Sequence, residues 1–173
     1  MKSKGLFLVL FVIVVGVTFY SAFSGQTETM AHKPEVGFKA PPFELLGLNE
    51  EVTHRLESND QPILINFWAS WCGPCKDEAP DLNSVYEEYK DRVQFYAINM
   101  TDTDYRPNVD KFMEDYQFAL PVLLDQDGIV SKSYQVLAVP TTFFVDKNNV
   151  IVHKHVGAAT RSQLQEQLRK LVD

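Results

Sequence analysis

The alternation of apolar and polar positions along the chain predicts an α/β domain. Residues 62–68 form an apolar run of strand length between turn signals, which is typical of a buried central strand. The pattern then changes to helical spacing, with apolar residues three or four positions apart and Asp and Glu on the opposite face. The apolar residues that follow this spacing are Ala79, Leu82, Val85, Tyr86 and Tyr89. A helix is therefore expected directly after this strand.

Segments with strand-like and helix-like spacing of apolar residues continue to the end of the chain. Further predicted elements are a short strand or turn at 52–56, a strand at 93–97, a helix at 109–116, a short helical stretch at 130–134, paired strands at 141–145 and 150–156, and a final helix. The two late strands face each other across the polar turn at 146–149, as in a β-hairpin. Thr160 and Gln163 have the spacing of a capping box at the start of the final helix. The expected order is strand, helix, strand, helix, hairpin, helix, in one domain.

The first thirty residues have a different pattern. Residues 5–22 are almost continuously apolar and would reach about 27 Å as a helix, close to the ~30 Å hydrocarbon core of a bilayer. Lys2 and Lys4 precede this run and a negatively charged domain follows it, which predicts a cytoplasmic N-terminus and an extracytoplasmic domain. We therefore expect a cytoplasmic N-terminus at 1–4, one transmembrane signal-anchor at 5–24 in the cell membrane, a tether at 25–35 and the folded domain at 36–173. The alternatives are a signal peptide cleaved near Ser24 and a buried helix of the domain.

Composition and charge exclude several classes of function. Hydrophobic residues make up 45% of the 173 residues and charged residues 23%, which is typical of a globular protein rather than a disordered one. The formal net charge of −7, without any block of basic residues, argues against a nucleic-acid partner. The chain has two cysteines, and a single short bridge cannot stabilise a fold of this size. Their role is therefore expected to be chemical.

The two cysteines, Cys72 and Cys75, lie where the predicted strand gives way to the predicted helix. At this junction Cys72 would lie at the helix N-terminus, where free N–H groups and the helix dipole stabilise a thiolate. Cys75, one turn later, could then attack a mixed disulfide formed by Cys72. Pro74 suits the first turn because it has no N–H to leave unpaired, and Trp71 would supply an apolar wall beside the reactive sulfur. The pair is predicted to alternate between a dithiol and a disulfide.

A zinc site is the alternative for such a pair of cysteines. It would need two further ligands, and His153 and His155 could supply two nitrogens from one face of a strand. These histidines lie far downstream, and the sequence contains no second Cys-x-x-Cys. Alternation along the strand instead predicts that both histidines occupy a solvated strand face. We expect neither a metal nor another cofactor.

Residues 67–76, with the sequence Phe-Trp-Ala-Ser-Trp-Cys-Gly-Pro-Cys-Lys, resemble the active site of thioredoxins. Residues 39–45, 121–125 and 139–143 are similar to segments of the extracytoplasmic TlpA/ResA-like branch of that superfamily, and the resemblance extends over 36–173. It implies an α/β thioredoxin-like fold, with a central mixed β-sheet flanked by helices. It also implies that Pro140 is a cis-proline facing the cysteines, beside backbone that can hold a substrate strand. By the same resemblance, the substrate-binding residues are Trp71, Gly73, Pro74, Val139 and Pro140.

One position departs from cytoplasmic thioredoxins. Those proteins carry a buried aspartate where this chain has Asn66, and an amide cannot accept the proton of the second thiol. The ResA-like branch also lacks that aspartate and has a glutamate three residues after the second cysteine, which matches Glu78. One helical turn separates Cys75 from Glu78, so the resemblance implies a catalytic carboxylate near the two thiols. On spacing alone, an exposed helix acid beside Asp77 and Asp81 is the favoured interpretation of Glu78.

The resemblance implies a thiol–disulfide oxidoreductase that reduces disulfides in exported proteins such as apocytochromes c. Gly-Pro between the cysteines is typical of reducing thioredoxins. Outside the cytoplasm a reductant needs a supply of electrons, and the ResA-like branch implies a membrane thiol carrier as the donor. A membrane anchor would suit that partner, and a monomer is expected.

Other functions of the same fold are the alternatives. A disulfide oxidant or isomerase would use the same cysteines with electrons flowing in another direction. A copper chaperone of related fold is expected to have Cys-x-x-x-Cys, one residue longer than the spacing here. A thiol peroxidase would need a cysteine after a Pro-x-x-x-Thr-x-x motif, and a pure binding module would have no use for an intact cysteine motif.

Overall fold

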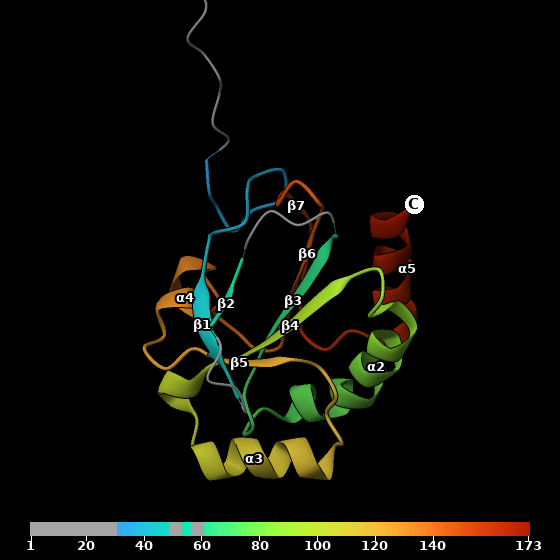
Figure 1. Cartoon of the computed structure of the whole chain (residues 1–173). Coiled ribbons are helices and arrows are strands. Elements are labelled where there is room, and N and C mark those ends of the chain that lie inside the picture. Colours follow the sequence, from blue (N-terminus) through green and yellow to red (C-terminus); the bar gives the residue numbers. More distant parts are fainter. Residues whose placement is uncertain (1–30, 49–52, 57–60) are drawn as a thin grey trace, which may run out of the picture. The chain divides into compact units, whose positions relative to one another are not determined.

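The fold is built on a seven-stranded mixed β-sheet (Figure 1). The computed structural model describes residues 31–48, 53–56 and 61–173 of the chain. Its strands are β1 (Glu44–Gly47), β2 (Thr53–Arg55), β3 (Ile63–Trp68), β4 (Gln94–Asn99), β5 (Val122–Leu124), β6 (Thr141–Val145) and β7 (Ile151–Val156). Its helices are α2 (Gly73–Tyr89), the 3-10 helix η1 (Thr101–Thr103), α3 (Arg106–Asp115), α4 (Ile129–Ser133) and α5 (Arg161–Val172).

The strand order across the sheet is β2-β1-β5-β4-β3-β6-β7. β3, β4 and β5 run parallel to one another, whereas the remaining neighbours pair antiparallel. The mixed sheet that the resemblance implied is therefore confirmed. Helices lie on both sides of it: in Figure 1, α2 and α5 lie together on one side of the sheet and α4 lies on the other.

β3 is the buried centre of the sheet. All six of its residues are buried, and it pairs in parallel with β4 and antiparallel with β6. Because side chains alternate along a strand, Ile63, Ile65 and Phe67 pack into one core, together with residues of α4. Leu64 and Trp68 pack into the other core, together with residues of α2, α3 and α5. A strand buried on both faces is typically a nearly continuous apolar run, and β3 is one apart from Asn66.

Two strands of the sheet, β1 and β5, were not predicted. The sequence pattern predicted no strand at residues 43–48 or at residues 121–124. β5 has three residues and β1 has four, with an exposed, half-buried, exposed, buried pattern. Segments this short show no reliable period, and their pairing depends on a partner far along the chain, as Leu46 with Leu124. The predicted hairpin of β6 and β7 and the capping box of Thr160 and Gln163 are confirmed.

The described part of the chain begins at Ala31, inside the segment that we expected to be a tether. Lys33 N–H donates a hydrogen bond to the carbonyl oxygen of Lys39 at 2.9 Å, and Gly37 N–H donates one to Ile151 at 2.8 Å. Pro34 is buried. Lys33 in the expected tether is therefore bonded to Lys39 in the domain, and Gly37 in the domain is bonded to the start of β7.

Within residues 31–48, 53–56 and 61–173, no helix combines the length and the apolar character that crossing a bilayer requires. The transmembrane segment expected at 5–24 lies outside the residues that the structure describes.

Candidate active site

A disulfide lies at the point where β3 ends and α2 begins. Cys72 is the N-cap residue of α2, with extended backbone (φ −80°, ψ 114°), and it is bonded to Cys75 in the first turn. The backbone N–H of Cys75 donates a hydrogen bond to Cys72 Sγ at 3.1 Å. Side-chain acceptors at the N-cap satisfy one of the free N–H groups of a helix, and here a sulfur does so. In the reduced protein the same N–H would stabilise a thiolate on Cys72.

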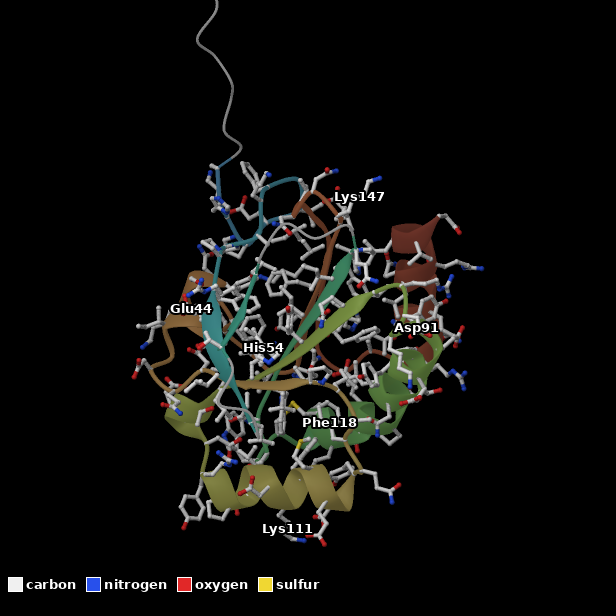
Figure 2. All side chains as sticks on the ribbon, viewed as in Figure 1. Glu44, His54, Asp91, Lys111, Phe118 and Lys147 are labelled. Atoms are coloured by element: carbon white, nitrogen blue, oxygen red, sulfur yellow. A yellow bond between two sulfur atoms is a disulfide. The ribbon has the colours of Figure 1, made fainter. Side chains whose placement is uncertain are left out.

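Exposure does not distinguish the two cysteines in this oxidised state, since Cys72 is 4% exposed and Cys75 is 3% exposed. Their positions do distinguish them. Cys72 Sγ lies at the N-terminus of α2, 3.4 Å from the carbonyl oxygen of Val139, whereas Cys75 lies within the first turn of that helix. Lys111 of α3 and Lys147 of the hairpin turn lie at opposite ends of the domain (Figure 2). A client sulfur has to reach Cys72 Sγ beside the carbonyl oxygen of Val139.

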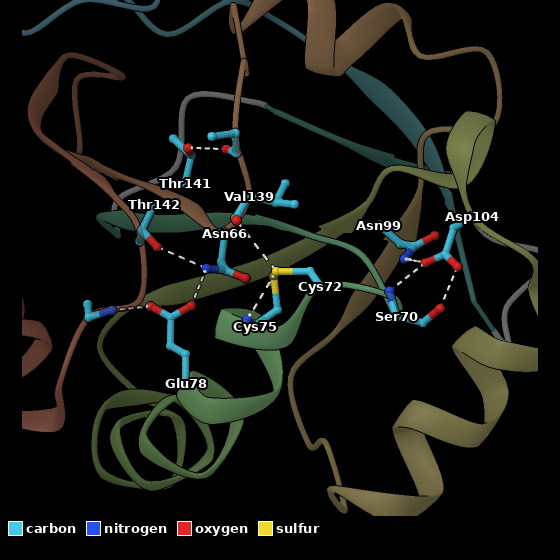
Figure 3. The surroundings of a disulfide bond; sticks show 12 residues. Asn66, Ser70, Cys72, Cys75, Glu78, Asn99, Asp104, Val139, Thr141 and Thr142 are labelled. Carbon is cyan, nitrogen blue, oxygen red and sulfur yellow. Dashed lines mark hydrogen bonds between the residues drawn. A yellow bond between two sulfur atoms is a disulfide. The ribbon is translucent and has the colours of Figure 1, made fainter.

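The peptide bond between Val139 and Pro140 is cis, as the resemblance implied. Pro140 is buried at the start of β6, while Ala138 before it is exposed. Thr141 Oγ1 donates a hydrogen bond to the carbonyl oxygen of Ala138 at 2.7 Å, which ties this loop to the first residue of β6. Figure 3 shows the Val139 carbonyl directed at Cys72 Sγ. The cis-proline loop and the start of α2 thus form two sides of the site.

Glu78 is buried beside the disulfide rather than exposed on the helix surface. Its Oε1 accepts a hydrogen bond from the Ala159 backbone N–H at 2.9 Å, and its Oε2 accepts one from Asn66 Nδ2 at 3.2 Å. Burial disfavours the carboxylate and raises the pKa of Glu78 from 4.5 to about 7, although the two hydrogen bonds oppose the shift. The interpretation from spacing alone, an exposed acid, is therefore wrong. A carboxyl group with this pKa can accept and release a proton at neutral pH.

Asn66, at the centre of β3, holds the carboxylate of Glu78. Its Nδ2 donates both amide protons, one to Glu78 Oε2 and one to Thr142 Oγ1 at 2.9 Å (Figure 3). An aspartate at position 66 would instead place a second negative charge against Glu78, so an amide suits this position. Asn66 Oδ1 is buried and has no hydrogen-bond partner among the described residues.

Asp104, which was not among the site residues predicted from the sequence, fixes the segment that precedes Cys72. Its carboxylate accepts hydrogen bonds from the Ser70 N–H at 2.6 Å and from Ser70 Oγ at 2.5 Å. It also accepts from Asn99 Nδ2 at 2.9 Å and from the Tyr105 N–H at 2.8 Å. All four partners are donors, so two carboxylate oxygens satisfy them where an amide would not (Figure 3). No sequence signal marks Asp104, because it is one acid in a polar loop.

The other predicted substrate-binding residues border the disulfide at the surface. Trp71 is largely exposed, and its Nε1 donates a hydrogen bond to the carbonyl oxygen of Thr103 at 3.0 Å. Its indole is thus held against the loop after β4. Gly73 and Pro74 are exposed in the first turn of α2, and a Cβ built at Gly73 would meet no atom within 4 Å beyond its chain neighbours and the nearby helix backbone. The space in front of the first turn is therefore open to a client.

The alternation of β7 predicted that His153 and His155 lie on a solvated strand face. They do not. Both are half-buried, because α5 covers that face of the sheet. They share a cavity with Phe144, Ala159, Gln163, Leu164, Glu166 and Gln167. Burial, and then the charges of His155 and Lys170, lower the pKa of His153. Within the described part of the chain, no cluster of three or more His, Cys, Asp or Glu side chains has the geometry of a metal site.

A cysteine pair at the N-terminus of the first helix after a central strand, facing a cis-proline, is the arrangement of thioredoxin-like thiol–disulfide oxidoreductases. Comparison with protein-family models agrees with this class, because residues 36–154 match the model of the AhpC/TSA family. The chain belongs to that family.

Two relatives and one solved structure show what this chain is similar to. It is 31% identical over 175 residues to the thiol-disulfide oxidoreductase ResA of Bacillus cereus, covering 98% of each chain. It is 33% identical over 173 residues to the thioredoxin-like protein YneN of Bacillus subtilis, covering 97% of this chain and 98% of that one. The crystal structure of the exposed lipoprotein thioredoxin of Streptococcus pneumoniae superposes with a TM-score of 0.66 at 27% identity, over 76% of this chain and 100% of that one. The protein is thus a thiol–disulfide oxidoreductase.

Proposed function

We propose that the protein reduces disulfide bonds of exported proteins outside the cytoplasm, with Cys72 as the nucleophile and Cys75 as the resolving thiol. The observation that carries this assignment is the hydrogen bond from Cys75 N–H to Cys72 Sγ at the start of α2, since it favours the thiolate on Cys72. The Gly73-Pro74 dipeptide between the cysteines supports reduction as the direction.

In the proposed cycle, the Cys72 thiolate attacks one sulfur of a client disulfide. The other client sulfur leaves as a thiolate and takes up a proton, so that a mixed disulfide joins the client to Cys72. Cys75 then loses its proton and attacks Cys72 Sγ, and the second client thiolate leaves and is protonated. Two electrons and two protons have passed to the client, and the enzyme is left with the Cys72–Cys75 disulfide that the structure contains.

Glu78 is the proposed base for the second step. It follows Cys75 by one turn of α2, and its carboxylate is directed back toward Asn66, on the disulfide side of the helix (Figure 3). A carboxyl group with a pKa of about 7 is divided between its two protonation states at neutral pH. It can therefore take the proton of Cys75, directly or through one water, when the mixed disulfide is resolved.

The proposed site of action is the outer side of the cell membrane. Residues 5–24 would anchor the chain, with residues 1–4 in the cytoplasm, residues 25–35 as a tether and the domain from Val36 onward outside. One similar structure is described as an exposed lipoprotein, which supports an extracytoplasmic location. Each cycle consumes two electrons, and we propose a membrane thiol carrier as their donor. The proposed clients are apocytochromes c, and the protein is proposed to act as a monomer.

Fractionation tests the location. We expect the full chain in the membrane fraction, because the 18 residues 5–22 are uncharged and almost continuously apolar and match the thickness of a bilayer core. A shortened chain that begins at Met30 is expected in the soluble fraction, with its disulfide reductase activity retained. Recovery of the full-length gene product as a soluble extracytoplasmic protein trimmed near Ser24 would contradict the anchor and support a cleaved signal peptide.

A further inference from the structure

The amide oxygen Oδ1 of Asn66 is buried beside the disulfide, and it has no hydrogen-bond partner among the described residues. The whole residue is 0% exposed. A buried acceptor without a donor costs free energy, and such atoms are few in native proteins. Since this one lies next to the reactive cysteines, we looked for a donor that another redox state of the site supplies.

The two hydrogen bonds of Asn66 Nδ2 fix the direction of the unpaired oxygen. Nδ2 donates to Glu78 Oε2 at 3.2 Å and to Thr142 Oγ1 at 2.9 Å. Turning the amide over would place Oδ1 against the Glu78 carboxylate, where two acceptors repel each other. Oδ1 therefore faces away from Glu78, and Figure 3 shows it pointing toward the disulfide.

The fold brings Cys75 to the same side of β3. Because side chains alternate along a strand, Asn66 shares a face with Leu64 and Trp68, which pack in one core cluster with Cys75. Cys75 and Glu78 are one turn apart, on one face of α2, and both are buried. The amide of Asn66 thus has Glu78 on its nitrogen side and Cys75 on its oxygen side.

Reduction supplies the missing donor. In the disulfide Cys75 Sγ carries no hydrogen, but in the mixed disulfide of the proposed cycle it is a thiol, whose S–H is a weak donor. Cys72 Sγ is then bonded to the client and carries no charge that would attract this S–H. Both oxygens of Glu78 already accept a hydrogen bond. The acceptor left without a donor is Asn66 Oδ1.

We propose that Asn66 is a positioning residue for the resolving step, because its Oδ1 accepts a hydrogen bond from the Cys75 thiol while its Nδ2 holds the Glu78 carboxylate. One amide then places the donor and the acceptor of the proton side by side, and no proton passes through the amide itself. When Cys75 attacks Cys72 Sγ, its proton moves to Glu78. The bond between Cys72 and the client breaks, and its electron pair leaves with the client sulfur. The inference rests on the proposed roles of Cys75 and Glu78.

Infrared absorption tests the hydrogen bond, because the S–H stretching band moves to lower frequency when a thiol donates. The chain has two cysteines, so Cys72→Ala leaves one S–H group and removes the thiolate that competes for it. At about pH 8, Glu78, with a pKa of about 7, is mostly ionised, and a thiol with the ordinary pKa of about 8.5 is mostly protonated. We expect the band of the Cys72→Ala full chain below the frequency of a thiol in apolar solvent. Adding Asn66→Ala should abolish that shift.

Asn99→Ala in the same Cys72→Ala background is the matched control. Asn99 is also 0% exposed, and it lies on the neighbouring strand β4, where its Nδ2 is bonded to Asp104. This substitution should leave the band where it is in Cys72→Ala. A band at the free-thiol frequency in Cys72→Ala would overturn the proposal without depending on the folding of any Asn66 variant. A band that Asn66→Ala does not move would overturn it as well.

The effect on the reaction is measured with both cysteines present, by rapid mixing of the reduced full chain with a disulfide-bonded peptide. In Asn66→Ala we expect the mixed disulfide to persist about tenfold longer than in the wild type, because small losses of orientation cost up to about 10²-fold. An unchanged lifetime, with the wild type reducing the peptide, would overturn the positioning role. A wild type that does not reduce the peptide would contradict the proposed function instead.

Discussion

Replacing Cys75 by serine is expected to leave client proteins trapped on Cys72 as mixed disulfides. The first attack needs only Cys72, whose Sγ is held at the start of α2 by the Cys75 backbone N–H, and that N–H is kept in the variant. Resolution of the mixed disulfide then depends on a thiol from solution. In the wild type the resolving thiol is the neighbouring Cys75, whose effective concentration is far higher. We expect turnover to fall by at least ~10³-fold. Non-reducing electrophoresis after incubation with a disulfide-bonded client measures the trapped species.

Cys72→Ser is the matched control for this experiment. It removes the proposed nucleophile and leaves Cys75 within the first turn, 3% exposed in the oxidised structure. We expect neither turnover nor a trapped client. Equal trapping by Cys72→Ser and Cys75→Ser would contradict the assignment of the two roles.

Replacing Glu78 by glutamine is expected to slow disulfide exchange by about 10²-fold or less, because a positioned base contributes about 10²–10⁴-fold and thiols are acidic enough to need little help. It should also change the pH dependence of thiol alkylation. In the wild type the titration of Glu78, with a pKa of about 7, is coupled to that of the two thiols, and glutamine removes that coupling. Stopped-flow alkylation of the reduced proteins from pH 5 to pH 10 measures both effects.

The same substitution should change how stability depends on pH. A carboxyl group whose pKa is raised from 4.5 to about 7 binds its proton more tightly in the folded state than in the unfolded state. Its contribution to the free energy of unfolding is therefore fully present below about pH 4.5 and is lost as pH rises through about 7. Between these limits we expect the wild type to lose about 3 kcal/mol relative to Glu78→Gln. Denaturant unfolding of the oxidised proteins, in which the cysteines do not titrate, measures this difference.

Asp77→Asn is the control for both experiments, because Asp77 is the adjacent carboxylate on α2 and is exposed. It should leave the alkylation profile and the pH dependence of unfolding close to those of the wild type. Superimposable curves for the wild type and Glu78→Gln would show that Glu78 takes no part in the thiol chemistry.

The parts of the fold with a long, regular pattern could be predicted from the sequence. β3 is a six-residue run buried on both faces, and α2 repeats its apolar residues over many turns, so both were evident. β1 and β5 were missed because four and three residues carry no period. The burial of His153 was also missed, since the alternation of β7 cannot show that α5 covers that face.

The candidate site, like the fold, could be predicted from the sequence only in part. The cysteines and Trp71 lie next to one another in the sequence, so their chemistry could be predicted from it. The supporting contacts join residues far apart: Glu78 and Ala159 are 81 residues apart, Asn66 and Thr142 are 76 apart, and Ser70 and Asp104 are 34 apart. The sheet brings β3, β6 and the loop after β4 side by side, and α2 contacts the segment between β7 and α5, which a single sequence does not show.

The reduction potential of the Cys72–Cys75 pair tests the proposed direction of electron flow most directly. It is measured by equilibrating the full chain with buffers of known dithiol-to-disulfide ratio and determining the fraction of reduced enzyme. We predict a value near that of thioredoxin, about −270 mV, because a reductase must hold its electrons less tightly than its clients do. A value near about −120 mV, as in a strong disulfide oxidant, would contradict it.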